Sequence, residues 1–336
     1  MRVLLVKMSS LGDVIHTLPA LTDAARAIPG IRFDWVVEEA FAEIPGWHPA
    51  VDRVIPIALR RWRKRPVQSF GGPEWRRYKA ALHKKHYDAV IDAQGLLKSA
   101  FIARLVKAPR YGMDKASARE RLASHAYHHR INVPLELHAV ERIRTLFARS
   151  LKYPLPGERG DYGVRAGLAR DAQKKPEGLL FFHGTARAEK LWPESHWVQL
   201  AGLVAAQGYQ VWLPWGSERE RERAVRIASA DGQAEVLPRL DLLGLASMLM
   251  DVAGAVAVDT GLAHLSAALD VPTVSLYGPT NTALIGAYGR NQVHIQSPVG
   301  VSDTGDPMAM MQSISAERVL QELTNMLESP SPLESL

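Results

Sequence analysis

The chain has 336 residues, which exceeds the length at which a single hydrophobic core usually stops growing, so two domains of about 150 residues are expected. Apolar residues make up 47% of the sequence, and 41 Lys and Arg exceed 35 Asp and Glu, which favours polyanionic partners. The absence of cysteine excludes a disulfide framework and thiolate metal sites, and it suits the cytoplasm.

The sequence predicts neither an export signal nor a membrane span. The apolar run at residues 3–6 is too short for the core of a signal peptide. The most apolar region, residues 242–269, is interrupted by Asp251 and Asp259 before the roughly 20 residues that a bilayer-spanning helix needs. Any contact with a membrane is therefore expected to be peripheral.

In the first half, short Val/Ile/Leu-rich runs alternate with longer amphipathic segments, as in parallel sheets covered by helices on both faces. The predicted strands are residues 2–7, 33–38, 53–57, 87–94 and 110–113, and a helix over 137–151 closes the domain. We expect a first domain over 1–152 and then a linker, residues 153–178, which is rich in Pro, Gly and charge.

The alternation restarts in the second half. The predicted strands are residues 179–183, 210–214, 235–238, 255–259 and 273–277, followed by a last helix over 316–328 and a tail over 329–336. The second domain is expected over 179–328. These patterns predict an α/β protein with two doubly wound, Rossmann-like domains that face each other across a cleft, where ligands bind beyond the carboxyl ends of the strands.

The loop after the first strand carries hydroxyl groups and a carboxylate. Ser9, Ser10, Gly12 and Asp13 precede a helix that begins near Val14, an arrangement that can bind anions or hold a base. Ser and Asp are also favoured N-cap residues, so Asp13 as a simple cap is an equally good interpretation. Gly-x-Gly-x-x-Gly is absent from this loop, which disfavours a nicotinamide dehydrogenase.

A second motif follows the predicted strand at 255–259. Asp259, Thr260 and Gly261 form a turn into a helix that carries His264, and the amides of such a helix N-terminus favour a diphosphate. The alternative interpretation makes Asp259 and Thr260 caps and His264 an ordinary surface residue. The loop after residue 183 adds Thr185 and Lys190 as further phosphate partners, although loop lysines are most often simply solvated.

Residues 60–65 place five positive charges and Trp62 on a predicted loop after the third strand. Guanidinium groups suit carboxylates and phosphates on a sugar acceptor, whereas nucleic acid is disfavoured because no recognisable nucleic-acid module accompanies the charges. Lys98, Arg119 and Arg121 could extend this surface. The cluster of His125, His128 and His129 gives little support for a zinc site.

Several segments together resemble the lipopolysaccharide heptosyltransferases, with the type I branch nearest. They are residues 6–21, 33–39, 92–95, 190–193, 259–264 and 277–280, in the same order along nearly the whole chain. The resemblance implies a GT-B fold, an ADP-L-glycero-D-manno-heptose donor, the inner Kdo of Kdo2-lipid A as acceptor and an inverting reaction without metal or cofactor. It also implies a monomer, peripheral on the cytoplasmic face of the inner membrane.

The resemblance also assigns roles to residues. Asp13 looks like the catalytic base and Lys190 like a catalytic cation at the diphosphate. Family members carry a second Thr where this chain has Ala186, so only the backbone can serve there. The implied donor contacts are Ser10, Thr185, Ala186, Lys190, Glu220, Leu240, Asp259, Thr260, Gly261 and His264. The expected acceptor contacts are Arg60, Arg61, Arg63, Lys64, Lys98, Arg119 and Arg121.

Three other functions stay open on the sequence. A type II heptosyltransferase shares the fold and the Asp-Thr-Gly turn but differs in the first loop. A nucleotide-sugar epimerase of the same architecture would convert the donor without any acceptor. A basic RNA-binding protein is the non-enzyme alternative, and the sequence offers no stacking platform to support it.

Overall fold

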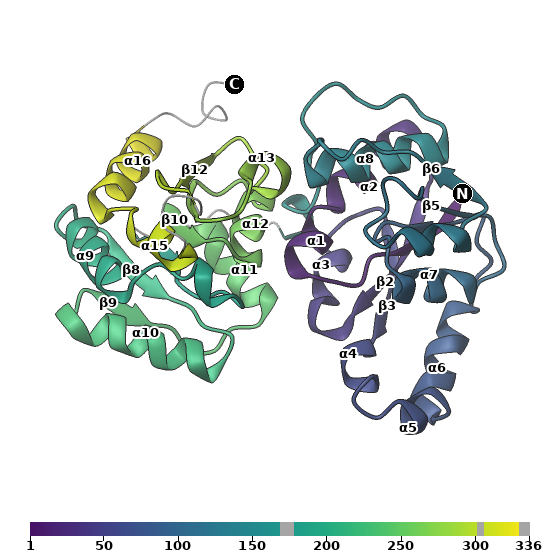
Figure 1. Ribbon diagram of the computed structural model, residues 1–336, viewed down its shortest axis with the longest axis horizontal. Helices are drawn as coiled ribbons and strands as arrows, with labels where there is room; N and C mark the ends of the chain where they lie inside the picture. Colours follow the sequence, from purple (N-terminus) through teal and green to yellow (C-terminus); the bar gives the residue numbers. More distant parts are fainter. Residues whose placement is uncertain (169–177, 301–305, 329–336) are drawn as a thin grey trace. The chain divides into compact units, whose positions relative to one another are not determined.

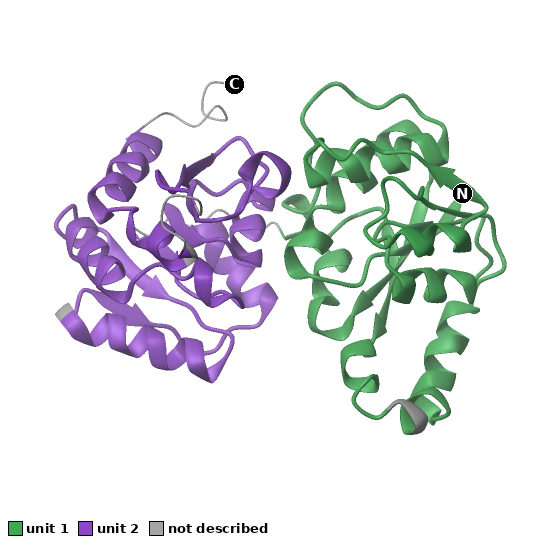
Figure 2. Ribbon diagram, viewed as in Figure 1, with its two compact units in different colours: residues 1–169 green, residues 170–336 purple. Residues whose placement is uncertain are grey.

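The computed structural model describes residues 1–168, 178–300 and 306–328, and it divides into two compact units, residues 1–169 and 170–336 (Figures 1 and 2). Each unit contains one six-stranded sheet in which all neighbouring strands are parallel. Parallel strands need crossover connections, and helices supply them in both units. The two-domain α/β prediction is confirmed at this level.

The sheet of the first unit has the strand order β3-β2-β1-β4-β5-β6. Its strands are β1 (Arg2–Val6), β2 (Arg32–Glu38), β3 (Val51–Ile57), β4 (Ala89–Asp92), β5 (Arg110–Met113) and β6 (His129–Ile131). Its α-helices are α1 (Leu11–Ile15), α2 (Leu18–Ala27), α3 (Glu43–Gly46), α4 (Leu59–Trp62), α5 (Pro66–Phe70), α6 (Pro73–Leu82), α7 (Leu97–Arg104) and α8 (Ala139–Leu151). Short 3₁₀ turns are η1 (Glu39–Phe41), η2 (Arg121–Ala126) and η3 (Ala166–Leu168).

Helices cover both faces of this sheet because successive side chains of each strand point to opposite faces. Leu4 and Val6 of β1 pack with Trp62, Trp75 and other side chains of α4, α6 and α7. On the other face, Phe33 of β2 contacts Phe147 of α8, with ring centroids 6.0 Å apart. Strand β1 is therefore buried from both sides, and the loop that follows it has a rigid support.

A buried ion pair joins α2 to α8. The guanidinium of Arg144 donates to Asp23 at 2.6 Å, and both side chains are almost fully buried. Arg144 also donates to the carbonyl of Pro156 at 3.3 Å, so the chain beyond α8 packs on this unit. Arg26 pairs with Asp161 further along. Residues 153–168, expected to begin the linker, therefore extend the first unit, and residues 169–177 of the expected linker lie outside the described residues.

The sheet of the second unit has the order β12-β11-β10-β7-β8-β9. Its strands are β7 (Gly178–Phe182), β8 (Gln210–Leu213), β9 (Ala234–Val236), β10 (Gly254–Val258), β11 (Thr273–Tyr277) and β12 (Gln292–Gln296). Its α-helices are α9 (Glu194–Ala205), α10 (Glu218–Asp231), α11 (Leu242–Asp251), α12 (Gly261–Ala268), α13 (Thr282–Ile285), α15 (Pro307–Gln312) and α16 (Ala316–Glu328), and η4 (Ala188–Lys190) is a 3₁₀ turn.

One continuous core fills one face of the second sheet. Phe181 and Val256 of the central strands pack with Trp197 of α9, Ile227 of α10 and Leu323 of α16. The last helix begins and ends where the sequence predicted, because its apolar stripe packs against β10, β11 and α9. The predicted tail, residues 329–336, lies outside the described residues.

Two strands and one helical segment differ from the sequence prediction. β6 and β12 were not predicted, since neither has a run of buried apolar residues. Of residues 60–65, predicted as a loop, residues 60–62 lie in α4, where buried Trp62 anchors the segment to the core, and residues 63–65 connect α4 to α5. In the part of the chain that the structure describes, no helix is long and apolar enough to cross a bilayer.

The ion pair between α2 and α8 gives a stability prediction. Arg144→Met leaves the Asp23 carboxylate buried without its partner, which should lower the free energy of unfolding of the first unit by about 3 kcal/mol. The measurement is the amide hydrogen exchange of peptides from α2 and α8 over a series of urea concentrations. Because both helices belong to the first unit, this exchange reports the unfolding of that unit alone. Arg26→Met, which breaks an exposed pair, should change it by less than about 1 kcal/mol. Equal effects of the two changes would contradict the assignment.

Candidate active site

The candidate residues gather where the strand order of each sheet reverses. In the first unit, the neighbouring strands β1 and β4 are followed in the chain by strands on opposite sides of the pair. In the second unit, the same is true of the neighbouring strands β7 and β10. The loops after two such strands diverge and open a crevice at the carboxyl edge of the sheet, the usual ligand position in doubly wound folds.

In the first unit, Asp13 lies in the first turn of α1, close to an ammonium group. Lys7, the residue after β1, is 6% exposed, and its Nζ lies 3.4 Å from Asp13 Oδ1. Lys7 also donates to the carbonyl of Ala93 at 3.1 Å, which fixes its position. The other carboxylate oxygen, Oδ2, accepts from the backbone N–H of Ser10 at 2.9 Å and from its hydroxyl at 2.8 Å. Asp13 is thus the N3 residue of a capping box, in which Ser10 is the N-cap residue, and one half of an ion pair.

These contacts determine the ionisation of Asp13. Burial acts to raise the pKa of its carboxyl, but the Lys7 ammonium, the two hydrogen bonds from Ser10 and the charge of His16 together lower the pKa well below its ordinary value. The group is therefore a carboxylate at neutral pH. About a third of the side chain is exposed, so one edge of the carboxylate stays accessible to a substrate.

Gln94, just beyond β4, holds the first loop in place. Its Oε1 accepts from the backbone N–H of Met8 at 2.8 Å, and its Nε2 donates to the hydroxyl of Ser9 at 3.4 Å. Gly95 follows with a φ of +66°, which favours glycine, and a Cβ there would lie 3.5 Å from the Arg119 amide. Gln94 therefore joins the two loops of the first crevice.

In the second unit, a cation and a carboxylate from neighbouring strand ends form the core of the site. Lys190 Nζ lies 2.5 Å from Asp259 Oδ2, and both side chains are nearly buried. The hydroxyl of Thr280, which follows β11, donates to the same oxygen at 2.5 Å, and Thr185 donates to the backbone carbonyl of Asp259 at 3.0 Å. Three loops thus meet at one carboxylate.

Thr260 is the N-cap residue of α12, with extended backbone angles, and Gly261 begins the helix. The first amides of a helix lack partners within it and, with the helix dipole, attract an anion. His264 lies one turn further along and is mostly buried. The predicted Asp-Thr-Gly turn therefore sits directly beside the ammonium of Lys190, where a diphosphate would meet both.

Glu220 and Leu240 follow the next two strands of the same sheet. Glu220 Oε2 accepts from the backbone N–H groups of Gly216 and Ser217 at 2.8 and 3.1 Å. A Cβ at Gly184 would lie 2.8 Å from Glu220 Oε1, so the loop of Thr185 and the Glu220 side chain lie close together. Leu240 is half-buried against the start of α11, and Ala186 is exposed. The predicted donor residues of this unit therefore all follow strands at one sheet edge.

Arg60 and Lys98, two predicted acceptor residues, act on the same carboxylate. Glu38, at the end of β2, accepts from the backbone N–H of Arg60 at 2.8 Å, and the Arg60 guanidinium lies over the Phe41 ring. Burial raises the pKa of Glu38, while the Arg60 amide and the charges of Arg60 and Lys98 act in the opposite direction. The charges of one predicted acceptor residue beside β2 and of another on α7 therefore both act on Glu38.

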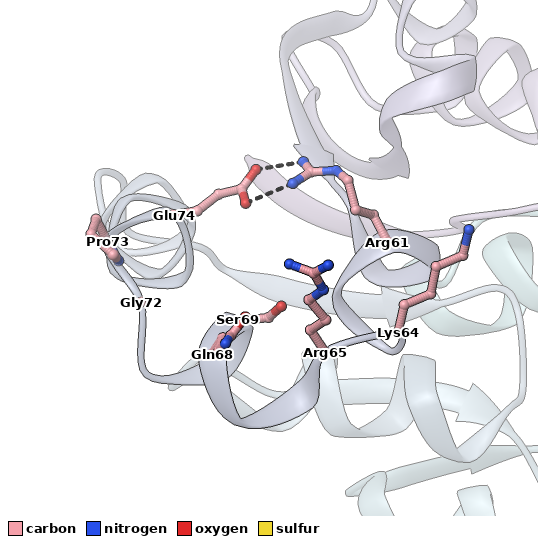
Figure 3. A pocket seen from close by; sticks show the side chains of 8 residues that line it. All are labelled: Arg61, Lys64, Arg65, Gln68, Ser69, Gly72, Pro73 and Glu74. Atoms are coloured by element: carbon pink, nitrogen blue, oxygen red, sulfur yellow. Dashed lines mark hydrogen bonds and ion pairs between the residues drawn. The ribbon is translucent and has the colours of Figure 1, made fainter.

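An open pocket of about 450 Å³ lies between α4, α5 and the start of α6 (Figure 3). Arg61, Lys64 and Arg65 line it with Glu74, and the Arg61 guanidinium pairs with Glu74 at 2.6 Å and with Glu39 at 3.1 Å. Hydrogen bonds from Arg61 and from the Trp62 indole lower the pKa of Glu74 to about 2. Arg63 is exposed but does not line this pocket, so the predicted basic cluster is divided.

Arg119 and Arg121 lie away from this pocket, on exposed backbone before and within η2. They are nearer to α7, because η2 packs against that helix. Of the predicted histidine cluster, His129 stacks on Tyr111 and His128 contacts Arg110. Among the described residues, no group of three or more His, Asp or Glu could hold a metal.

Three residues of these sites were missed from the sequence: Lys7, Gln94 and Thr280. Each contacts its partner only because parallel strands end side by side. A polar residue at the carboxyl end of a predicted strand is the signal that could have identified Lys7 and Gln94.

The chain is similar to a known protein family and to several known proteins. Residues 75–308 match the family described as glycosyltransferase family 9 (heptosyltransferase). Lipopolysaccharide heptosyltransferase 1 of Pseudomonas aeruginosa is 60% identical over 298 residues, 88% of this chain and 84% of that protein. The structure of E. coli heptosyltransferase WaaC with ADP has a TM-score of 0.90 at 48% identity and covers 97% of this chain and 100% of that one. Its complex with ADP-2-deoxy-2-fluoro heptose gives 0.87 at 47% identity and covers 97% and 99%.

The type II branch is more distant. Lipopolysaccharide heptosyltransferase 2 of Salmonella typhimurium is 31% identical over 150 residues, 41% of this chain and 43% of that protein. The likeness to the type 1 structures confirms the GT-B class in both units. The chain therefore belongs to glycosyltransferase family 9, the heptosyltransferases.

Proposed function

We propose that this glycosyltransferase moves L-glycero-D-manno-heptose from ADP-heptose to the inner Kdo of Kdo2-lipid A, with inversion at the anomeric carbon. The enzyme is a type I heptosyltransferase of lipopolysaccharide core biosynthesis. The observation that carries the donor assignment is the Lys190–Asp259 pair beside the N-terminus of α12, in a chain similar to a heptosyltransferase solved with ADP. We place the enzyme in the cytoplasm, at the inner membrane.

In this proposal Lys190 and the amides of α12 bind the diphosphate. Asp259 is an anion and would repel phosphate, so its role is to orient the Lys190 ammonium and to accept a hydroxyl of the heptose. Thr280 and Thr185 hold Asp259 in that position from two further loops. Glu220 has one oxygen turned toward the Gly184 loop and would accept the ribose hydroxyls.

Asp13 is the proposed general base. Its Oδ2 is occupied by two hydrogen bonds from Ser10, whereas Oδ1 faces Lys7 at 3.4 Å, beyond normal hydrogen-bond length. Oδ1 is therefore the atom that takes the proton of the acceptor hydroxyl. The oxygen of the acceptor hydroxyl then attacks the anomeric carbon as the bond from that carbon to the diphosphate breaks. The electron pair of the broken bond leaves with ADP.

The basic residues of α4 and α7, together with Arg119 and Arg121, would bind the anionic acceptor. Guanidinium groups match carboxylates and phosphates in geometry, and the charges of Arg60 and Lys98 both act on Glu38.

The direct test mixes the protein with ADP-heptose and Kdo2-lipid A and measures the acceptor mass. We expect one added heptose. Conversion of the donor without an acceptor would favour the epimerase, and addition only to an acceptor that already carries one heptose would favour type II activity. Oligonucleotide binding with a steep salt dependence, without any transfer, would favour the RNA-binding alternative.

Asp13→Asn should lower kcat by about 10² to 10⁴, because the amide keeps an oxygen for Ser10 but cannot accept the proton. The measurement is kcat with both substrates saturating. Asp306→Asn, which changes the cap of α15 in the same way, is the control and should leave kcat unchanged. A kcat within tenfold of wild type for Asp13→Asn would return Asp13 to the role of a helix cap.

Lys190→Ala should lower kcat at saturating donor by about 10²-fold as well as weaken donor binding, because negative charge on the departing diphosphate grows toward the transition state. The control is Arg187→Ala, a cation of the same loop that is exposed and pairs with Glu189. Single-turnover rates separate chemistry from ADP release. A wild-type kcat would reduce Lys190 to a residue that binds donor and transition state equally.

Lys7→Met should move the acidic limb of the pH profile of kcat/KM to higher pH. The Lys7 ammonium lowers the Asp13 pKa, so its loss raises that pKa, and the base is then protonated over a wider acidic range. The profile of Lys115→Met, an exposed lysine of the same unit, should match wild type. If the acidic limb of the Lys7→Met profile stays at the same pH as in the wild type, a group other than Asp13 determines it.

A further inference from the structure

Three large apolar side chains are exposed on two neighbouring elements of the first unit. Leu97 and Phe101 of α7 are 51% and 50% exposed, and Leu122 of η2 is 66% exposed. Exposed apolar residues are common singly, whereas several on adjoining elements indicate an interaction surface.

The surface is firmly supported. Ala100 of α7 packs with Ala123, Ala126 and Tyr127, which fastens η2 to the helix. Leu97 and Phe101 are four residues apart, so they share the outer face of α7. The Phe101 ring also stacks on Trp75 of α6, with centroids 6.3 Å apart and an interplanar angle of 12°. The inner face of α7 is thus occupied by packed residues, and Leu97 and Phe101 lie on its exposed face.

Positive charge surrounds the three apolar side chains. Among the acidic side chains nearby, Glu120 accepts from the backbone N–H of Leu97 at 2.5 Å, and Glu74 is paired with Arg61. The basic residues on and beside α7 and η2 are Lys98, Arg104, Arg119 and Arg121, of which the three arginines are exposed. The surface therefore has a net positive charge.

We propose that Leu97, Phe101 and Leu122, with the cations around them, are the surface by which the first unit docks on an anionic bilayer. Apolar side chains interspersed with Lys and Arg match the boundary between headgroups and acyl chains. The assignment rests on the proposed function in one respect: a lipid-anchored acceptor requires the enzyme to work at such a surface.

Two contributions to docking follow, and salt separates them. The attraction of the cations falls as the Debye length shrinks from about 10 Å at 0.1 M salt to about 3 Å at 1 M. Insertion of the apolar side chains does not depend on screening in this way. Binding should therefore need anionic lipid at low salt and be weakened, not abolished, when salt is added after docking.

The first experiment measures sedimentation with vesicles of phosphatidylcholine, with and without phosphatidylglycerol. The triple variant Leu97→Ser, Phe101→Ser and Leu122→Ser should bind the anionic vesicles about tenfold or more weakly than wild type. A matched triple variant, Leu135→Ser, Leu155→Ser and Ile285→Ser, removes apolar side chains of 57%, 44% and 45% exposure elsewhere and should bind like wild type. Equal binding by all three proteins would overturn the proposal.

The second experiment needs only single changes, so it does not depend on the triple variant folding. The chain has no cysteine, so Leu122→Cys can be labelled at one position with a polarity-sensitive fluorophore. Its emission should shift to the blue on anionic vesicles, whereas that of labelled Ile285→Cys should not. A bound protein whose label at position 122 stays in water would overturn the proposal. Dimer dissociation caused by the triple serine variant, with vesicle binding unchanged, would instead assign the surface to a second copy of the chain.

Transfer to a water-soluble acceptor sugar without lipid separates this proposal from the proposed function. The triple serine variant should retain wild-type kcat on the soluble acceptor and lose turnover on Kdo2-lipid A in vesicles. An enzyme that docks through Leu122 but transfers no heptose to either acceptor would contradict the function and leave the surface assignment intact. An equal loss on both acceptors would contradict the surface assignment.

Discussion

The parallel pairing of two central strands in each unit is the constraint on which both candidate sites depend. Val6 of β1 is in register with Asp92 of β4, so the next residues, Lys7 and Ala93, are also neighbours. In the second unit, Ala257 of β10 is in register with Phe182 of β7, which brings Asp259 to the Thr185 loop. A slip of one residue would turn each functional side chain to the other face of its sheet.

Each site contains a pair formed by a lysine and an aspartate, but the two pairs differ in a way that fits different chemistry. Lys190 and Asp259 are 2.5 Å apart and nearly buried, so the pair is a fixed unit that presents one cation to a ligand. Lys7 and Asp13 are 3.4 Å apart, and Asp13 is about a third exposed. The first geometry suits binding of a charged group, and the second leaves a carboxylate oxygen accessible for proton transfer.

The sequence predicted what is encoded locally and missed what arises from packing. Strands with four or five buried apolar residues in a row were found, whereas the edge strands β6 and β12 expose polar side chains and carry no such signal. The Asp-Thr-Gly turn was predicted because cap residues and helix start are adjacent in sequence. Thr280 contacts Asp259 from another strand 21 residues away, and no spacing rule connects the two. Trp62 was predicted to lie in a loop because its neighbours in the sequence are charged. Its burial in the core could not be inferred from those neighbours.

The ion pair of Asp13 with Lys7 weakens the proposed base, since a lowered pKa makes a carboxylate a weaker proton acceptor. A base must also be ionised before it can act and must lose its proton before the next cycle. The Lys7 ammonium, fixed on the Ala93 carbonyl, favours the carboxylate in both respects. In the proposed mechanism, protonated Asp13 beside Lys7 is the higher-energy state, so the carboxyl group would lose its proton readily to water after ADP leaves. The proton transfer itself is driven by the attacking hydroxyl, which becomes strongly acidic as its oxygen bonds to the anomeric carbon. A weak base that is always ready therefore serves this reaction better than a strong base that is often protonated.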